Sequence, residues 1–392
     1  MRRKSLIGAA FTTAAALLLA ACGGSSAVSE GSDSAAAESS TQATDAPEGS
    51  ESAPPSSEPA AGTWYPTGVS VWGERGFETA ATQAEYSPVG KATQPWNVCV
   101  SFPHLKDSYW LAANYGVVQQ SMEQGVNMTL VEAGGYENLD KQIQQIENCA
   151  QSNDAIVIGA ISFEGLNRTI DKLVADGKVV IDFINGVSSA NTTAQSLVSY
   201  REIAAQTANY LLAQTAGQEV TVAWFPGPKG AGFAEEANKG FTETLAGSNV
   251  TVVNTQWGDT GKEAQSKLIE DALAANPDIN FIAGNAVTAE AAIPILRDRG
   301  LTDSIGVLSY YMTPGTYAGI EQGSVLASAA DPAVLTSRIA IDQAVRALEG
   351  QAYDVHVAPD LEVVDGALLP TWDRTTTLAP NDWKPEFSVQ GQ

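Results

Sequence analysis

The stretch NVCVSFPHLKDSYWLAANYGVVQQSMEQGVNMTLVE, residues 97–132, decides the fold. A short apolar run from Asn97 to Phe102 is followed by residues with helical spacing, and a second apolar run covers Val126 to Glu132. Asp107 or Ser108 is suited to cap the helix at its start, and Gly125 is suited to end it. We therefore expect a strand, a helix and a second strand. The apolar residues predicted on the buried face of the helix are Leu111, Tyr115, Val118 and Met122.

The same alternation continues along the chain. Further strands are predicted at 155–159 and 178–183, and a second set at 220–225, 250–256, 281–283 and 305–309, with amphipathic helices between them. Alternating strands and helices are typical of a doubly wound parallel sheet. Because 392 residues exceed one typical core, we predict an α/β fold with two doubly wound parallel-sheet lobes joined by hinge strands.

The composition also suggests boundaries between these parts. We expect residues 96–198 and 328–355 to form lobe 1, and residues 199–327 and 356–392 to form lobe 2. Residues 63–95 fit neither lobe, and their aromatic side chains indicate a strap packed on the surface.

The N-terminus has the features of an export signal. Arg2, Arg3 and Lys4 precede an uncharged apolar run, and residues 1–21 are predicted to be a lipoprotein signal peptide cleaved before Cys22. Cys22 would then carry a lipid and hold the mature protein at the outer face of the cytoplasmic membrane or in the periplasm. Residues 22–62 are rich in Gly, Ser, Ala and acidic residues, which predicts a disordered acidic tether.

Charge and cysteine content narrow the class of protein further. The formal net charge of −24 makes nucleic acid and anionic lipid poor partners, so any membrane contact is expected through the N-terminal lipid only. With Cys22 lipidated, Cys99 and Cys149 remain, and a disulfide between them is the simplest interpretation for an exported chain. A redox or nucleophilic pair is the alternative.

Aromatic residues follow several of the predicted strands. The carboxyl ends of parallel strands line the ligand crevice of α/β proteins, so rings at these positions are expected to face a ligand. A trimethylated nitrogen donates no hydrogen bond and is held by ring faces, each contributing about 0.5 to 2 kcal/mol. The predicted ligand-binding rings are Tyr109, Trp110, Tyr136, Tyr200 and Tyr311, with Phe183 and Asn185 at the same edge. Asp107 either caps the helix or adds a negative charge that favours a cationic ligand.

The sequence indicates no catalytic or metal site. His104 and His356 are the only histidines, and neither a GxSxG motif nor a phosphate-binding loop is present. The glycines of GPKGAG, residues 227–232, are interpreted as a turn between a strand and a helix, His104 as a loop residue, and Tyr115 and Tyr310 as core. We therefore expect a binding protein, not an enzyme, and no cofactor.

Several motifs point to a known family. YSPVGKATQPWNVCVSFPHLKDSYW at 86–110, EAGGY at 132–136, SYYMTPG at 309–315 and PEFSV at 385–389 resemble the TorT family of periplasmic trimethylamine N-oxide recognition proteins, over most of residues 64–392. The resemblance implies the type I periplasmic binding protein fold. It also implies a pocket formed by Asp107, Tyr109, Trp110, Tyr136, Tyr200 and Tyr311 that takes trimethylamine N-oxide or a related methylated amine.

The resemblance also implies a partner, a membrane sensor histidine kinase that the receptor controls. Two features depart from the family: Tyr200 stands where Trp is expected, and a lipid tether replaces free export. The alternative function is the solute-binding component of an ABC importer for a quaternary amine or a sugar, with a permease as the partner.

Overall fold

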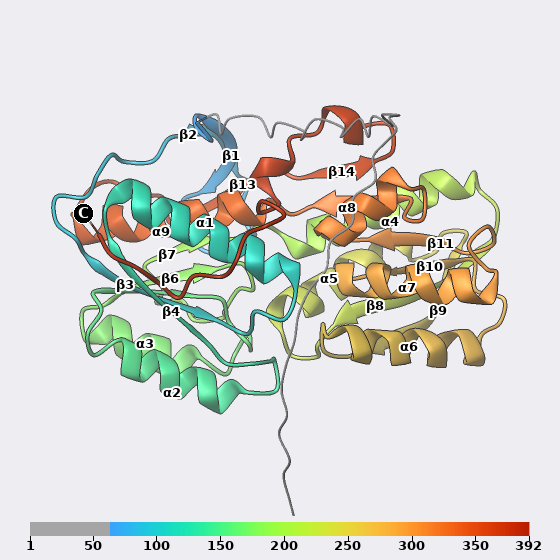
Figure 1. Ribbon diagram of the computed structural model, residues 1–392, viewed down its shortest axis with the longest axis horizontal. Helices are drawn as coiled ribbons and strands as arrows, with labels where there is room; N and C mark the ends of the chain where they lie inside the picture. Colours follow the sequence, from blue (N-terminus) through green and yellow to red (C-terminus); the bar gives the residue numbers. More distant parts are fainter. Residues whose placement is uncertain (1–62, 392) are drawn as a thin grey trace, which may run out of the picture. The chain divides into compact units, whose positions relative to one another are not determined.

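The computed structural model describes residues 63–391 and shows an α/β fold with two sheets (Figure 1). The signal peptide, Cys22 and most of the tether expected from the sequence lie outside the described residues. Among the described residues, no helix is both long enough and apolar enough to cross a membrane.

The first sheet has nine strands, and its central strands are parallel. Across the sheet the strands are β15 (Ser388–Val389), β4 (Asn127–Glu132), β3 (Asn97–Phe102), β5 (Ala155–Ile158), β6 (Val179–Phe183), β7 (Ala194–Ser196), β13 (His356–Pro359), β1 (Thr67–Trp72) and β2 (Thr82–Tyr86). Helices α1 (Ser108–Gln124) and α9 (Ala333–Leu348) cover one face, and α2 (Leu139–Cys149) and α3 (Asn167–Ala175) cover the other (Figure 1). We call this sheet and its helices lobe 1.

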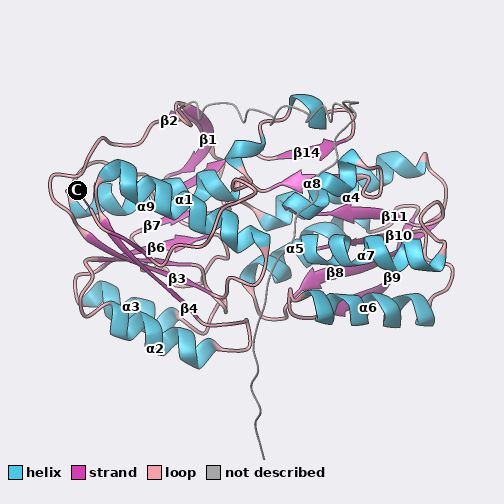
Figure 2. Cartoon of the chain, viewed as in Figure 1, coloured by secondary structure: helices cyan, strands magenta, loops and turns pink. Residues whose placement is uncertain are grey.

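The second sheet has six strands, all parallel except the edge strand β14. The order is β14 (Glu362–Asp365), β12 (Ala327–Ala330), β11 (Gly306–Ser309), β10 (Phe281–Gly284), β8 (Val220–Gly227) and β9 (Val250–Trp257). Its helices are α4 (Tyr200–Thr215), α5 (Gly232–Leu245), α6 (Lys262–Ala275), α7 (Ala286–Arg299) and α8 (Pro314–Glu321) (Figure 2). We call this sheet and its helices lobe 2. Two short 3-10 helices, Leu369–Thr371 and Arg374–Thr376, follow β14.

The chain passes between the lobes more often than the sequence suggested. It crosses between β7 and α4, between β12 and α9, and between β13 and β14, and it returns to lobe 1 at β15. Residues 356–392, expected in lobe 2, therefore contribute β13 and β15 to the first sheet and only β14 to the second. Residues 63–95, expected outside both lobes, supply β1 and β2. The cause is long-range pairing, because β1 lies antiparallel to β13 at the opposite end of the chain.

Helix α1 shows why these residues form this element. The Asp107 side chain accepts a hydrogen bond from the backbone N–H of Trp110 and so caps the first turn, and Gly125 ends the helix with a φ of 70°. The expected buried stripe was wrong at its end, because Met122 is 58 % exposed. Small residues make the closest contact instead: a Cβ on Gly116 would lie 2.6 Å from Ser337 of α9. A pattern based on large apolar side chains does not detect such a contact.

The two remaining cysteines of the described chain are joined. Cys99 of β3 and the last residue of α2, Cys149, form a disulfide with an S–S distance of 2.03 Å. Both belong to the packed layer between the first sheet and helices α2 and α3. The bond therefore ties strand β3 to the end of helix α2.

Candidate functional site

The carboxyl ends of strands from both sheets meet around one small space, which we call the aromatic chamber. Two acidic or amide side chains, one hydroxyl and six rings line it. These residues are Asp107, Tyr109, Trp110, Tyr136, Asn185, Tyr200, Phe233, Thr260 and Tyr311. Their positions follow from the fold, since the loops after β3, β4 and β6 come from lobe 1 and those after β8, β9 and β11 come from lobe 2.

The rings contact one another across the gap between the lobes. The ring of Tyr109, from lobe 1, meets Tyr311, from lobe 2, edge to face with centroids 5.0 Å apart. The ring of Tyr136 lies 5.6 Å from that of Phe233, again one from each lobe. The cavity between them is only ≈ 10 Å³, the room of about one water molecule. A larger ligand therefore requires the rings or the lobes to move apart.

Trp110 belongs both to the chamber and to the core. It is 2 % exposed and packs on Phe102 and Phe183 with centroid distances of 4.7 and 6.1 Å. Gly159 leaves room for the indole, because a Cβ there would lie 2.6 Å from Cη2 of Trp110. Phe183, expected at the crevice edge, lies behind Trp110 and does not line the chamber. It supports the indole and does not face the cavity.

A buried carboxylate joins two of the tyrosines. The hydroxyls of Tyr109 and Tyr200 both donate to Oδ2 of Asp331 at 2.6 Å, and the two hydroxyl oxygens are 2.9 Å apart. Asp331 lies between β12 and α9, at one of the crossings between the lobes, and is 0 % exposed. Burial raises its pKa from 3.8 to about 6, although the two hydroxyl donors lower it. The sequence analysis missed this residue. The reason is that no strand was predicted at Ala327–Ala330, which Asp331 directly follows.

A second carboxylate lies at the start of α1. Oδ1 of Asp107 accepts the hydrogen bond from the N–H of Trp110 at 3.1 Å, so the capping role is present, and the residue also lines the chamber. Burial raises the pKa of Asp107 to about 7, against the lowering effect of the Trp110 N–H, while the nearby Glu290 raises it further. Negative charge in the chamber is therefore present above that pH and is destabilised by the surroundings.

His104 is a buried residue at the chamber's edge, where a simple loop residue was expected. It is 0 % exposed, its Nε2 lies 3.3 Å from the hydroxyl of Thr260, and its ring meets Tyr136 edge to face at 5.4 Å. Burial, assisted by the neighbouring Lys106, lowers its pKa to about 4. The imidazole is therefore neutral at physiological pH and contributes no cation to the site.

The structure brings most of the expected site together. Asp107, Tyr109, Trp110, Tyr136, Asn185, Tyr200 and Tyr311 all line the one space, and Phe183 does not. Asn185 is held there because its amide donates to the hydroxyl of Tyr136 at 2.9 Å and to the carbonyl of Ala160 at 2.7 Å. Phe233 and Thr260 were not expected. They follow β8 and β9, and both would have been indicated by applying to lobe 2 the rule that residues after the carboxyl ends of parallel strands line the ligand crevice, which we call the strand-end rule.

The chemistry of the lining favours a cation. Within the described part of the chain, no Lys or Arg is among the lining residues. No group of three or more His, Cys, Asp or Glu suited to a metal ion occurs among residues 63–391. Ring faces together with carboxylates attract a positively charged, alkylated group without any covalent chemistry.

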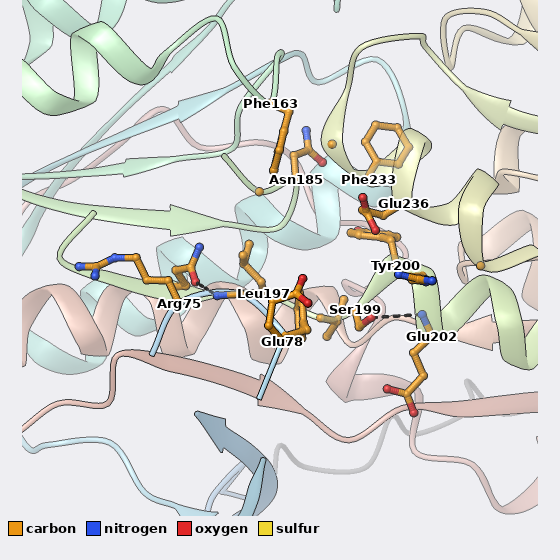
Figure 3. A pocket seen from close by; sticks show the side chains of 18 of the residues that line it. Arg75, Glu78, Phe163, Asn185, Leu197, Ser199, Tyr200, Glu202, Phe233 and Glu236 are labelled. Carbon is orange, nitrogen blue, oxygen red and sulfur yellow. Dashed lines mark hydrogen bonds between the residues drawn. The ribbon is translucent and has the colours of Figure 1, made fainter. Parts of the chain in front are cut away.

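A much larger cavity adjoins the chamber and shares Asn185, Tyr200 and Phe233 with it. Figure 3 shows these side chains together with Glu78, Glu202 and Glu236 around this space, whose volume is ≈ 840 Å³. We call it the outer cavity. Its walls come from the loop after β1, the loop after β6, and helices α4 and α5.

Comparison with known proteins agrees with the fold and with a binding role. Residues 98–352 match the periplasmic binding protein domain, and the chain belongs to the periplasmic binding protein family. Within it, the chain is similar to the periplasmic protein TorT of Escherichia coli strain K12, with 32 % identity over 303 residues that cover 76 % of this chain and 86 % of that protein. This membership indicates a periplasmic protein, and its relatives are binding proteins.

Two solved structures are also similar. One is an ABC transporter solute binding protein from Bradyrhizobium sp. BTAi1 with bound bis-tris, with 48 % identity, a TM-score of 0.73 and coverage of 84 % of this chain and 100 % of that one. The other is TorT in a complex with the TorS sensor domain in the presence of TMAO, with 29 % identity, a TM-score of 0.68 and coverage of 74 % and 99 %.

Proposed function

We propose that the aromatic chamber binds a small methylated amine, trimethylamine N-oxide or a close relative, and that the protein reports it to a membrane sensor histidine kinase. The observation that carries the proposal is the meeting of rings from both lobes over a site whose described lining has the carboxylate of Asp107 and no Lys or Arg, with the buried carboxylate of Asp331 behind two of the rings. Ring faces take up the methyl groups, and the carboxylates of Asp107 and Asp331 stabilise positive charge on nitrogen.

Closure of the lobes provides the signal in this proposal. Tyr109 and Tyr136 contact the amine from lobe 1, and Tyr311 and Phe233 contact it from lobe 2. A ligand that touches both lobes binds the closed arrangement more tightly than an open one and therefore shifts the population towards it.

The partner is proposed from the similarity to TorT, which has been solved with the TorS sensor domain. The N-terminal lipid on Cys22 remains part of this proposal, and metabolic labelling with a fatty acid, lost in Cys22→Ala, tests it.

An importer is the second candidate. The 48 % identical protein is an ABC transporter solute binding protein, and its bound bis-tris is itself an amine. The two candidates differ in their partner, and the importer would carry a quaternary amine or a sugar. In a strain that lacks the protein, loss of uptake of a labelled amine would support the importer, whereas unchanged uptake with loss of amine-dependent kinase phosphorylation would support the receptor.

Ligand binding can be tested directly by calorimetry and thermal melting with trimethylamine N-oxide, choline, ribose and myo-inositol. Stabilisation by about 2.7 kcal/mol is expected for a true ligand at a concentration 100 times its dissociation constant. Binding of ribose or myo-inositol without any methylated amine would reject the proposal.

Trp110→Phe is the sharpest variant for this test. It keeps a ring in the packed position and removes the larger indole face, so affinity for trimethylamine N-oxide should fall by about 2- to 30-fold. Trp372→Phe is the matched control, because Trp372 packs on Tyr317 and lines neither cavity. Equal affinity in both variants would show that the indole does not contact the ligand.

A further inference from the structure

The outer cavity has the size of a ligand site, and the aromatic chamber does not. Small-molecule sites commonly enclose about 300 to 1,000 Å³. The outer cavity encloses ≈ 840 Å³, against ≈ 10 Å³ for the chamber. Asn185, Tyr200 and Phe233 line both spaces, so the chamber and the outer cavity adjoin at these three side chains.

One wall of the outer cavity is held in position by hydrogen bonds and ring contacts. The loop after β1 forms one wall, and its backbone is fixed: the N–H of Gly76 donates to Oε1 of Gln195 at 2.8 Å, and its carbonyl lies 2.8 Å from Nδ1 of His356. The rings of Trp72 and Phe77 pack against the ring of His356, each with a centroid distance of 4.5 Å. The wall is therefore held in place by contacts with β7 and β13.

The charges of the outer cavity are predominantly negative. Four glutamates and two arginines line it: Glu78, Glu202, Glu236, Glu243, Arg75 and Arg201. Arg201 pairs with Glu243, and Glu236 accepts from Lys239. Arg75 donates from Nε to the hydroxyl of Thr192 at 3.0 Å. Among the described residues, Glu78 and Glu202 form no ion pair, and Oε1 of Glu202 accepts only from the neutral amide of Gln206 at 3.3 Å.

We propose that the ligand extends beyond the aromatic chamber: its methylated nitrogen lies among the rings, and a substituent longer than methyl, carrying a neutral polar or cationic end, occupies the outer cavity. This inference rests on the proposed function and adds the substrate class. The apolar surfaces of Tyr200, Phe233 and Phe163 suit the carbon chain of the substituent. Glu78 and Glu202 favour an ammonium or hydroxyl end over a carboxylate, because a carboxylate meets like charge beside them. Arg75, on the wall formed by the loop after β1, has its guanidinium hydrogen-bonded to Thr192, and the two glutamates outnumber it.

Calorimetry with the mature protein tests this inference. The probes are tetramethylammonium, which has the head alone, and a pair with equal chains, aminopropyl-trimethylammonium and carboxypropyl-trimethylammonium. We expect the amino-ended probe to bind more tightly than the carboxyl-ended one. We also expect Glu202→Gln to weaken the amino-ended probe by about two- to fivefold, as for an ion pair partly open to water, and to leave tetramethylammonium unchanged. Glu219→Gln, an exposed residue outside both cavities, is the matched control.

A second variant blocks the space itself. Ala205 of α4 lines the outer cavity and not the chamber, so Ala205→Phe places a ring in part of the outer cavity and should weaken the chain-bearing probes by about tenfold while sparing tetramethylammonium. The inference is overturned if both kinds of probe respond equally to these variants, or if the carboxyl-ended probe binds as well as the amino-ended one. If none of the methylated amines binds at all, the proposed function itself fails, and that result is distinct from both.

Discussion

Replacing Asp331 with asparagine should stabilise the unliganded protein and weaken its binding of a cation. Asp331 is 0 % exposed, and burial raises its pKa from 3.8 to about 6. Each pKa unit corresponds to about 1.36 kcal/mol, so above pH 6 the ionised carboxylate lowers the free energy of unfolding by about 3 kcal/mol. Asparagine has no charge to bury and retains one oxygen that can accept from the hydroxyls of Tyr109 and Tyr200.

The direction in which stability changes with pH follows from proton binding by Asp331. Between pH 4 and 6 the folded protein holds the Asp331 proton and the unfolded chain has lost it, so wild-type stability falls as the pH rises through this window. The Asp331→Asn variant should therefore match the wild type near pH 4 and exceed it by about 3 kcal/mol at pH 8. Urea denaturation at pH 4.5, 6 and 8 measures the difference. Asp303→Asn, at an exposed position, is the control and should show no such divergence.

Ligand affinity should change in the opposite direction. A permanently charged amine such as tetramethylammonium favours the ionised carboxylate, so wild-type affinity should rise by up to about tenfold per pH unit below 6, rise further near pH 7 where Asp107 titrates, and then level. The variant should lose the rise below pH 6 and retain a weaker dependence near pH 7, where Asp107 titrates. A variant that is less stable than the wild type at pH 8 and binds the amine with an unchanged pH profile would refute the reasoning.

Two further predictions concern the support of the site. Gly159→Ala places a Cβ 2.6 Å from the indole of Trp110, so it should lower the free energy of unfolding by about 1 to 3 kcal/mol and weaken amine binding. Gly90→Ala is the control, because no atom lies within 4 Å of its new Cβ, and it should change neither quantity. Denaturation measures the stability, and calorimetry measures the binding. Replacing Cys99 and Cys149 together by serine should lower the unfolding free energy by about 4 kcal/mol, because the bond spans 50 residues; a loss below about 1 kcal/mol in urea denaturation would contradict the role we assign to the crosslink.

The two-sheet architecture could be predicted because its signals are local. Buried runs such as Asn97–Phe102 and the capping pair Asp107 and Gly125 lie within a few residues of the elements they define. The placement of residues 63–95 and 356–392 could not be derived in the same way. It depends on β1 pairing with β13 and on β15 pairing with β4, and neither partner is near in the sequence.

The candidate site likewise has residues that local sequence signals predict and residues whose placement depends on distant neighbours. The strand-end rule placed Tyr109, Tyr136 and Tyr311 at one crevice because it needs only the order of strands and loops. It failed for Phe183, which ends a strand but points to the layer behind Trp110. The direction of a side chain at a strand end depends on its neighbours, in this case the space left by Gly159, and one sequence does not show that.

The position of Asp331 connects the charge of the site with the movement of the lobes. The residue lies where the chain leaves β12 of lobe 2 and enters α9 of lobe 1, and its partners Tyr109 and Tyr200 start the two helices that follow β3 and β7. Two hydroxyl protons serve three close oxygen contacts in this cluster, so a carboxyl proton completes its hydrogen bonding. A methylated cation donates no hydrogen bond and acts on the cluster only by offsetting the charge of the ionised carboxylate. In our proposal a cation in the chamber offsets the charge of Asp331 through the space behind Tyr109 and Tyr200, so the stability of these three side chains at the crossing between the lobes depends on whether the chamber is occupied.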